Sequence, residues 1–323
     1  MPLTPEAGHA LYADETGVPL EVQLEAALAR NIAGGLAVAE MTSLSSVASG
    51  LLAEADDSTL LTINSEGLSV DFADTLTDMF THEGVLFSKI GLEVPSPLAF
   101  TEAGVDFARL SKAWGAMLEL DMQPELVIAP VLPIKEWKAV FQALQDDPYI
   151  NHDDGIRNGG LKIAHEVAGS WDGLQNHGNS VQIKGNRWDV CVMTGTDQPP
   201  LNQINHFGKD YRSDIYFSDE LTSSARAMGL DVSNLSSHMI HPTISAYLTL
   251  QANRFFANSY LGSATPPVDN AESNTWLHGT TTDRTQAPRA CWYGGDGQVR
   301  VILSRVTLKR EYIGVRLPVW GST

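Results

Sequence analysis

Cysteine is scarce in this sequence of 323 residues, which contains only Cys191 and Cys291. The two do not form a CxxC pair, whereas zinc sites built on thiolates need closely spaced ligands, so the sequence does not favour such a site. Two isolated cysteines are compatible with small buried thiols and also with a disulfide, whose geometry cannot be read from sequence. The sequence leaves both alternatives open.

Long apolar segments are also missing. The most apolar stretch, residues 24–38, is interrupted by Glu25, Arg30 and Asn31. A helix that crosses a bilayer needs about 20 mostly apolar residues, so we expect no membrane span. The first residues include Glu6 and lack the basic region of a standard secretory signal, so that route of export is not expected.

Basic residues are few, with 21 Lys and Arg against 39 Asp and Glu, and the net charge is −18. This balance argues against general nucleic-acid binding, which needs positive charge opposite phosphates. The charge is uneven: residues 1–125 hold 20 acidic and 4 basic side chains, whereas residues 276–316 hold 7 basic and 3 acidic ones. The two ends either meet different partners, or the acidic end is solvated and keeps the chain soluble by repulsion.

Catalytic motifs are absent as well. The sequence has no phosphate-binding loop, no GxGxxG, no HExxH and no GxSxG. The pair His165-Glu166 begins like a zinc-protease motif, but residues 167–169 do not continue it. We therefore predict a non-catalytic protein without a cofactor or a metal site. An enzyme site assembled from scattered polar residues of the segment 193–240 is the alternative that a motif search does not detect.

Two sets of residues carry metal-ligating groups without a metal-binding spacing. The oxygen-rich set consists of Asp146, Asp147, Asn151, Asp153 and Asp154, and its spacing does not fit the twelve-residue calcium loop. These residues are typical of a helix end followed by a turn. The second set consists of His206, His238 and His241, and no periodicity brings the three together.

The N-terminal part shows helix and hairpin patterns. An apolar stripe recurs every four residues at Leu20, Leu24, Leu28, Ile32 and Leu36. It predicts a helix that either seals a homo-oligomer or packs on its own domain. Alternation in residues 61–63 and 68–72 predicts a hairpin. A boundary at Gln123-Pro124 divides the chain into an acidic oligomerisation or attachment region, residues 1–122, and a second domain, residues 123–323.

Helix and strand signals alternate from residue 107 to residue 256. Helices are predicted at residues 107–118, after Pro133 and at residues 241–256, and strands at residues 126–129, 161–163 and 188–192. The helix after Pro133 has its apolar residues on one face, at Ile134, Trp137, Val140, Phe141 and Leu144. The segment 193–240 is polar, and we expect it to be an irregular insertion.

Short strands with tight turns are predicted from Trp276 onward. Residues 294–297 (GGDG) join two alternating runs into a hairpin, and a last strand covers about residues 312–317. We expect an inward set of Val299, Val301, Leu303 and Arg316. The expected outward set consists of Tyr293, Arg300, Arg305 and the loop 278–286.

The order of these elements resembles the C-type lectin fold in its bacterial and phage versions. Those versions include relatives of formylglycine-generating enzyme and the variable proteins of diversity-generating retroelements. The resemblance rests on HPTISAYLTLQ (241–251), TWLHG (275–279), WYGGDGQVRV (292–301) and the closing GVRLP (314–318). It implies an α+β fold in which two helices and short antiparallel strands form the C-terminal domain, beside the mixed helix and hairpin region at the N-terminus.

The resemblance also implies a ligand-binding surface on the last strands and loops. The residues it assigns there are Trp276, His278, Thr280, Asp283, Arg284, Trp292, Tyr293, Asp296, Arg300 and Arg305. The tripeptides of calcium-dependent lectins (EPN, QPD, WND) are absent, and so is a motif matching the paired catalytic cysteines of the formylglycine enzyme. Trp276 and Trp292 each also fit a core position, because an alternating strand turns half of its residues inward.

The sequence therefore predicts a non-catalytic ligand- or receptor-binding protein displayed on a virion or cell surface. Its expected partners are a protein or glycan receptor and other virion or surface proteins. We also expect a homo-oligomer that assembles through residues 1–122. The alternative is a structural virion protein, a decoration or attachment subunit that assembles through its N-terminal region.

Overall fold

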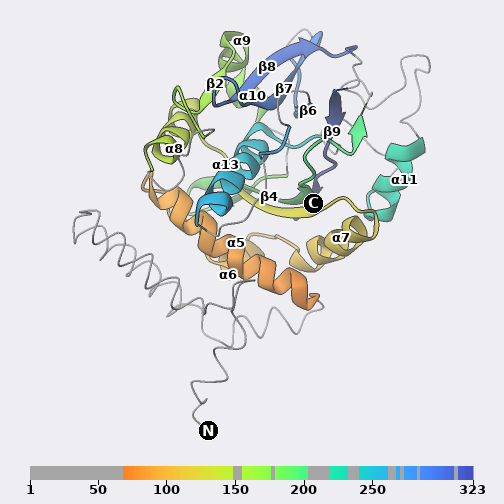
Figure 1. Cartoon of the computed structure of the whole chain (residues 1–323). Coiled ribbons are helices and arrows are strands. Elements are labelled where there is room, and N and C mark those ends of the chain that lie inside the picture. The colour runs from red at the N-terminus through yellow and green to blue at the C-terminus, as the bar shows by residue number, and fades with distance from the viewer. Residues whose placement is uncertain are drawn as a thin grey trace, which may run out of the picture. The chain divides into compact units, whose positions relative to one another are not determined.

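The computed structural model describes residues 68–147, 155–175, 179–202, 219–231, 240–260, 267–269, 273–281, 284–308 and 312–322. The chain divides into two compact units, Met1–Ala55 and Asp56–Thr323, and all described residues belong to the second. This unit is a mixed α and β fold with two sheets (Figure 1). The leucine stripe at residues 20–36 and the assembly it predicts lie outside the described residues and stay predictions.

The first sheet is antiparallel and is centred on one long strand. Its strands are β1 (Pro124–Pro130), β4 (Asn186–Thr194), β10 (Val319–Trp320) and β3 (Val181–Ile183), and the other three pair with β4. β1 and β4 match the strands predicted at residues 126–129 and 188–192. Both are buried over most of their length, because helices cover this sheet.

β1 is an edge strand whose free edge has few exposed donors. Val131 N donates to Arg187 O and Gly195 N donates to Gln123 O, so the odd-numbered residues face β4. The even-numbered residues therefore face the free edge, and Pro124 and Pro130 among them have no N–H. The buried Glu83 carboxylate accepts from Ile128 N at 3.1 Å. Proline and a side-chain cap thus close an edge that would otherwise pair with another strand.

The second sheet has six strands and contains the predicted hairpin. In order across the sheet they are β2 (Leu161–Ile163), β8 (Gln298–Arg305), β7 (Gln286–Tyr293), β6 (Asn274–Trp276), β9 (Ile313–Val315) and β5 (Leu201–Asn202). β7 and β8 pair antiparallel across the turn 294–297, which confirms the hairpin. β2 runs parallel to β8, and β6 runs parallel to β9.

Helix α13 (Ile244–Tyr260) lies between the two sheets (Figure 1). Phe255 packs edge-on against Trp292 of β7, with ring centroids 4.8 Å apart. The helix confirms the one predicted at residues 241–256, and its polar residues Thr249 and Gln251 are fully buried along with its apolar ones. Gln251 Nε2 donates to Val268 O at 2.7 Å, whereas Gln251 Oε1 and Thr249 Oγ1 have no partner among the described residues. A helix with strands on two sides has no solvated face, so its polar side chains need partners in the interior.

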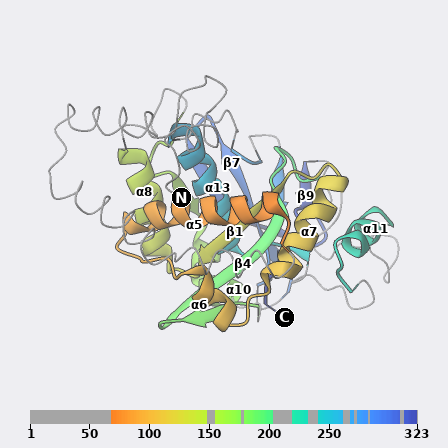
Figure 2. The ribbon, with the colours of Figure 1, turned by 90° about the horizontal axis from the view of Figure 1, so that it is seen from below.

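Three helices pack beneath the first sheet, as Figure 2 shows from below. They are α5 (Val70–Ser88), α6 (Pro97–Glu102) and α7 (Phe107–Glu119), capped by Ser69, Ser96 and Asp106. α7 confirms the helix predicted at residues 107–118. α5 corrects the predicted hairpin, because residues 70–72 form its first turn and residues 61–67 lie outside the described residues. Its buried Phe72, Leu76, Phe80 and Phe87 follow helical spacing, which overrides the short alternation at residues 68–72.

The expected boundary after residue 122 does not separate two units. Phe87 of α5 contacts Trp137 and Trp188, with centroids 6.1 and 6.5 Å apart. Phe100 of α6 also contacts Trp188, at 5.7 Å. These edge-on aromatic pairs place α5 and α6 in one core with the strands that follow residue 122.

Further helices lie between the strands. α8 (Ile134–Asp146) buries Trp137, Val140, Phe141 and Leu144, as its periodicity predicts. The short helices α9 (His165–Gly169) and α10 (Trp171–Leu174) follow β2. The segment 193–240 is not irregular throughout, since it includes α11 (Asp219–Ala227). None of the described helices has both the length and the apolar character that a membrane crossing requires.

Candidate binding face

The register of the β7–β8 hairpin separates its side chains into two faces. Trp292 pairs with Val299 and Ala290 pairs with Val301, and these residues are buried on the side of α13. The opposite side is called the outer face below. It carries Lys162, Asn274, Trp276, Ala287, Arg289, Cys291, Tyr293, Gln298, Arg300, Ile302 and Ser304. The expected inward set is confirmed for Val299 and Val301, and Leu303 is half-buried.

Three predicted residues form one contact group at the tip of the hairpin. The Arg300 guanidinium lies over the Tyr293 ring, 3.8 Å from its centroid, and forms an ion pair with Asp296. Tyr293 remains 38% exposed. The stacking and the ion pair restrict the long Arg300 side chain, so less conformational entropy is lost when a partner contacts it.

The turn beneath this group is fixed by a loop distant in sequence. Arg157 N donates to Gly297 O at 2.8 Å, and Asn158 Nδ2 donates to Asp296 O at 3.1 Å. Gln298 Nε2 donates in return to Asn158 O at 2.7 Å. These bonds hold the backbone on which Tyr293, Asp296 and Arg300 are displayed.

Arg289 occupies the middle of the outer face and was not predicted as a site residue. Its Nε donates to Ser304 Oγ at 2.7 Å and its Nη1 donates to Asn274 Oδ1. Burial lowers the pKa of the Arg289 guanidinium, while Cys291 and Tyr312 act in the opposite direction. Local sequence does not indicate its role, because Pro288 and Ala290 on either side suggest a strand interior.

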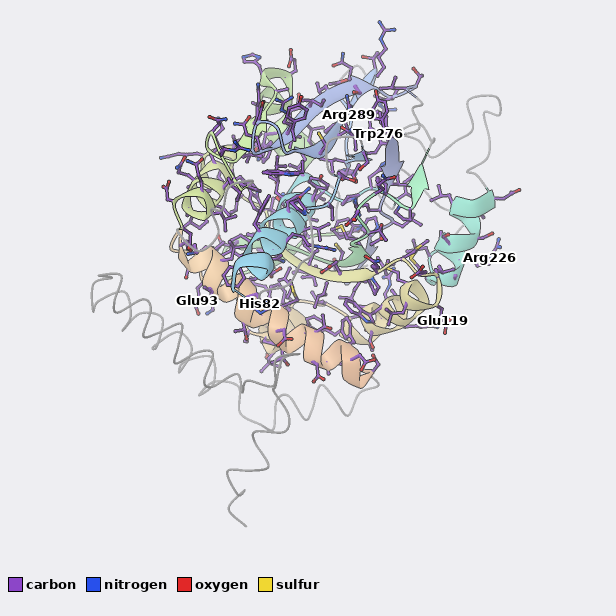
Figure 3. All side chains as sticks on the ribbon, viewed as in Figure 1. His82, Glu93, Glu119, Arg226, Trp276 and Arg289 are labelled. Carbon is purple, nitrogen blue, oxygen red and sulfur yellow. The ribbon has the colours of Figure 1, made fainter. Side chains whose placement is uncertain are left out.

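The predicted tryptophans lie on opposite faces. Trp276 is fully buried and pairs with Arg289 across the β6–β7 ladder, so it belongs to the outer face but has no exposed surface. Figure 3 shows Trp276 and Arg289 close together on the second sheet, apart from His82 on the helices. Trp292 points toward α13 and packs on Phe255, so the structure gives it a core position.

The other predicted residues are spread around the hairpin. His278 is almost buried after β6, and its N donates to Pro242 O at 2.8 Å. Thr280 is half-buried, and Arg284 is exposed. Arg305 is exposed at the open end of β8, opposite Gln286, and does not join the outer face. Asp283 lies outside the described residues.

Arg316 joins the two sheets from the interior. It forms an ion pair with Asp269 at 2.7 Å, and both side chains are fully buried. Its Nε donates to Thr275 Oγ1 of β6 at 2.9 Å, and its Nη1 donates to Thr194 O of β4 at 3.0 Å. The expected inward position of Arg316 is confirmed, and its contacts connect the last strands to the first sheet.

Groups with redox or metal-binding chemistry are mostly inside. Cys191 and Cys291 are free and buried, and burial raises the pKa of both thiols. Within the described ranges no three His, Cys, Asp or Glu side chains gather as a metal site. In the oxygen-rich set, Asp147 pairs with Lys89 at 2.8 Å, and Asn151, Asp153 and Asp154 lie outside the described residues. His241 is fully buried, and His206 and His238 are not described.

The chain matches no protein-family model, no curated protein and no solved structure.

Proposed function

We propose that this protein is a non-catalytic binding protein with a C-type-lectin-like fold, displayed on a virion or cell surface, and that it recognises a protein or glycan receptor through the outer face. The observation that carries the proposal is the group of Tyr293, Asp296 and Arg300 on a turn held by residues 157 and 158. Tyrosine and arginine are enriched at the centres of recognition surfaces, and a rigid framework reduces the entropic cost of binding.

The order of the elements supports the fold assignment. α8, the segment containing α11, α13 and the short strands β6 to β10 follow one another in the order on which the resemblance rests. The charge distribution supports the choice of face. The outer face carries Lys162, Arg289 and Arg300 on a chain with a net charge of −18. A basic surface attracts an acidic partner.

The proposal is tested by crosslinking from the outer face. A photoreactive phenylalanine replaces Tyr293 in one variant. In the control variant it replaces Leu118, a residue of α7 that is 51% exposed. We expect a saturable crosslinked partner from position 293 and none from position 118. The partner is then purified, and its affinity for Y293A/R300A and for L118A is measured by calorimetry.

Removing two central contact residues is expected to weaken binding about tenfold or more, whereas L118A leaves it unchanged. Equal crosslinking from both positions, or equal affinity of both variants with their folds intact, contradicts the proposal.

A further inference from the structure

Arg289 is a partly buried cation that the described part of the chain does not neutralise. Its hydrogen-bond acceptors, Ser304 Oγ and Asn274 Oδ1, are both uncharged. No carboxylate of the described residues lies within ion-pair distance of it. Burial without a counter-charge costs free energy, and the lowered pKa of the guanidinium reflects that cost.

Three other arginines, with side chains 0–26% exposed, show the contrast. Arg187 does not, because it is half-buried and its acceptors, Ser180 Oγ and Gln175 O, are also uncharged. Arg254 pairs with Glu125 at 2.6 Å, Arg316 pairs with Asp269 at 2.7 Å, and Arg300 pairs with Asp296. The fold supplies a carboxylate to these three cations, whereas the acceptors of Arg289 among the described residues are neutral and orient it. Such an arrangement is typical of a group whose counter-ion comes from outside.

The donors of Arg289 that have no acceptor among the described residues indicate which kind of group fits there. A guanidinium has five N–H donors in a planar fork, and two of them are used by Ser304 and Asn274. The remaining donors match the two oxygens of a planar carboxylate, which arginine binds in bidentate geometry.

The surroundings of Arg289 favour a negatively charged group. Arg300 is its diagonal neighbour across the β7–β8 ladder, within reach of a long side chain, and Lys162 follows beside Arg300 on β2. Arg300 Nε has no acceptor among the described residues. The exposed Tyr312 lies close enough to Arg289 to influence its pKa. Trp276, paired with Arg289 in register, gives the site a rigid wall.

We propose that Arg289 binds a carboxylate of the partner, so that the outer face recognises an acidic protein segment. This inference rests on the proposed binding function and adds the chemistry of the ligand. It makes Arg289 the anchor of the face, with Arg300 as a second source of positive charge.

The test is a titration of the full-length protein with a blocked hexaglutamate peptide, followed by calorimetry at constant ionic strength. Blocked hexaglutamine and inorganic phosphate are the comparison ligands. We expect saturable binding of hexaglutamate, no binding of hexaglutamine, and weaker binding of phosphate. R289Q is expected to reduce the affinity for hexaglutamate about tenfold, because a hydrogen bond to a charged group is lost.

R305Q is the matched control, since it removes the same charge from an exposed position of the same hairpin outside the outer face. R305Q is expected to reduce the affinity for hexaglutamate by less than about twofold, because salt screens an exposed surface charge. R289K covers the case in which R289Q does not fold, because it keeps the charge but loses the fork, and it too is expected to weaken binding.

Equal losses in R289Q and R305Q, absence of saturable hexaglutamate binding, or tighter binding of phosphate would overturn the inference. The crosslinked partner separates this failure from that of the proposed function. If its affinity falls in Y293A/R300A but not in R289Q, the face is retained and the carboxylate is excluded. If neither variant weakens it, the face itself is wrong.

Discussion

At the scale of single residues, Glu83 shows how a buried acid can serve the fold. The side chain is fully buried on α5, and its Oε1 accepts from Ile128 N of β1 and Asn253 Nδ2 of α13, both at 3.1 Å. Its Oε2 has no partner among the described residues. Burial raises the pKa of Glu83 well above its usual value, and these two hydrogen bonds offset only part of the effect. The carboxyl therefore joins three elements at a position where burial favours its protonated form.

Glu83 is predicted to make the protein less stable as the pH rises. The unfolded chain loses the Glu83 proton near the ordinary value of 4.5, whereas the folded chain keeps it to a higher pH. Above the unfolded pKa the folded state binds more protons, so this contribution falls by up to about 1.4 kcal/mol per pH unit until the folded pKa is passed. E83Q keeps the shape and removes the titration.

The measurement is urea unfolding of wild type and E83Q between about pH 5 and pH 9. We expect the wild type to lose stability relative to E83Q as the pH rises. Asp78 and His82 lie beside Glu83 on α5, and burial raises the pKa of the first and lowers that of the second. Both groups are present in both proteins, so their titration cancels to first order in the difference. A difference that does not change with pH would show that Glu83 is ionised in the fold.

At the scale of elements, the turn of the β7–β8 hairpin depends on Gly297. Its φ is +65°, and a Cβ there would lie 2.7 Å from Arg157 Cβ and 2.8 Å from Gly155 O. Glycine is therefore required both by the backbone conformation and by the approach of the loop that fixes the turn. The turn between β3 and β4 offers a comparison, because Gly185 has φ +86° but nothing within 4 Å of an added Cβ.

G297A is predicted to destabilise the protein more than G185A. Both substitutions place a side chain at positive φ, which costs about 1 kcal/mol, and G297A adds a steric clash of about 1–3 kcal/mol. Urea unfolding of the two variants gives the difference directly. Equal losses would mean that the loop at residues 155–157 moves aside without cost.

The hairpin also shows which parts of the site were predictable. Alternation and the GGDG turn predict two paired strands, and the structure has them in that register. Arg289 was missed because alternation alone does not say which face of a strand is covered. Trp292 and Trp276 look alike in sequence, but one faces α13 and the other faces away. The choice depends on where α13 lies, which local sequence does not specify.

At the scale of the whole molecule, residues 68–122 are part of the main core. Phe87 and Phe100 pack on Trp137 and Trp188. A chain of residues 56–323 is therefore predicted to unfold cooperatively, whereas a chain of residues 123–323 is not. Losing a buried phenylalanine costs about 3–5 kcal/mol, and a typical domain is stable by only about 5–15 kcal/mol. Near-ultraviolet circular dichroism and tryptophan fluorescence during urea unfolding measure this. A cooperative transition of residues 123–323 would restore a domain boundary at residue 122.

The sequence by itself determined the local elements with strong periodicity. The helix at residues 134–146, the helix after Pro242 and the β7–β8 hairpin follow from apolar spacing and turn residues, because both act over a few neighbouring positions. The low content of basic residues and the basic C-terminal part are likewise properties of the sequence alone.

The tertiary structure decided everything that depends on distant contacts. It made residues 70–88 a helix, because Phe72, Leu76 and Phe80 find a core to pack against. It joined the sheets through Arg316, Asp269 and Thr275, which no local pattern relates. It also placed Arg289 on the outer face with no carboxylate of the described residues within ion-pair distance. The reason is the same in each case: burial and charge pairing depend on which elements meet, and that is settled only when the chain folds.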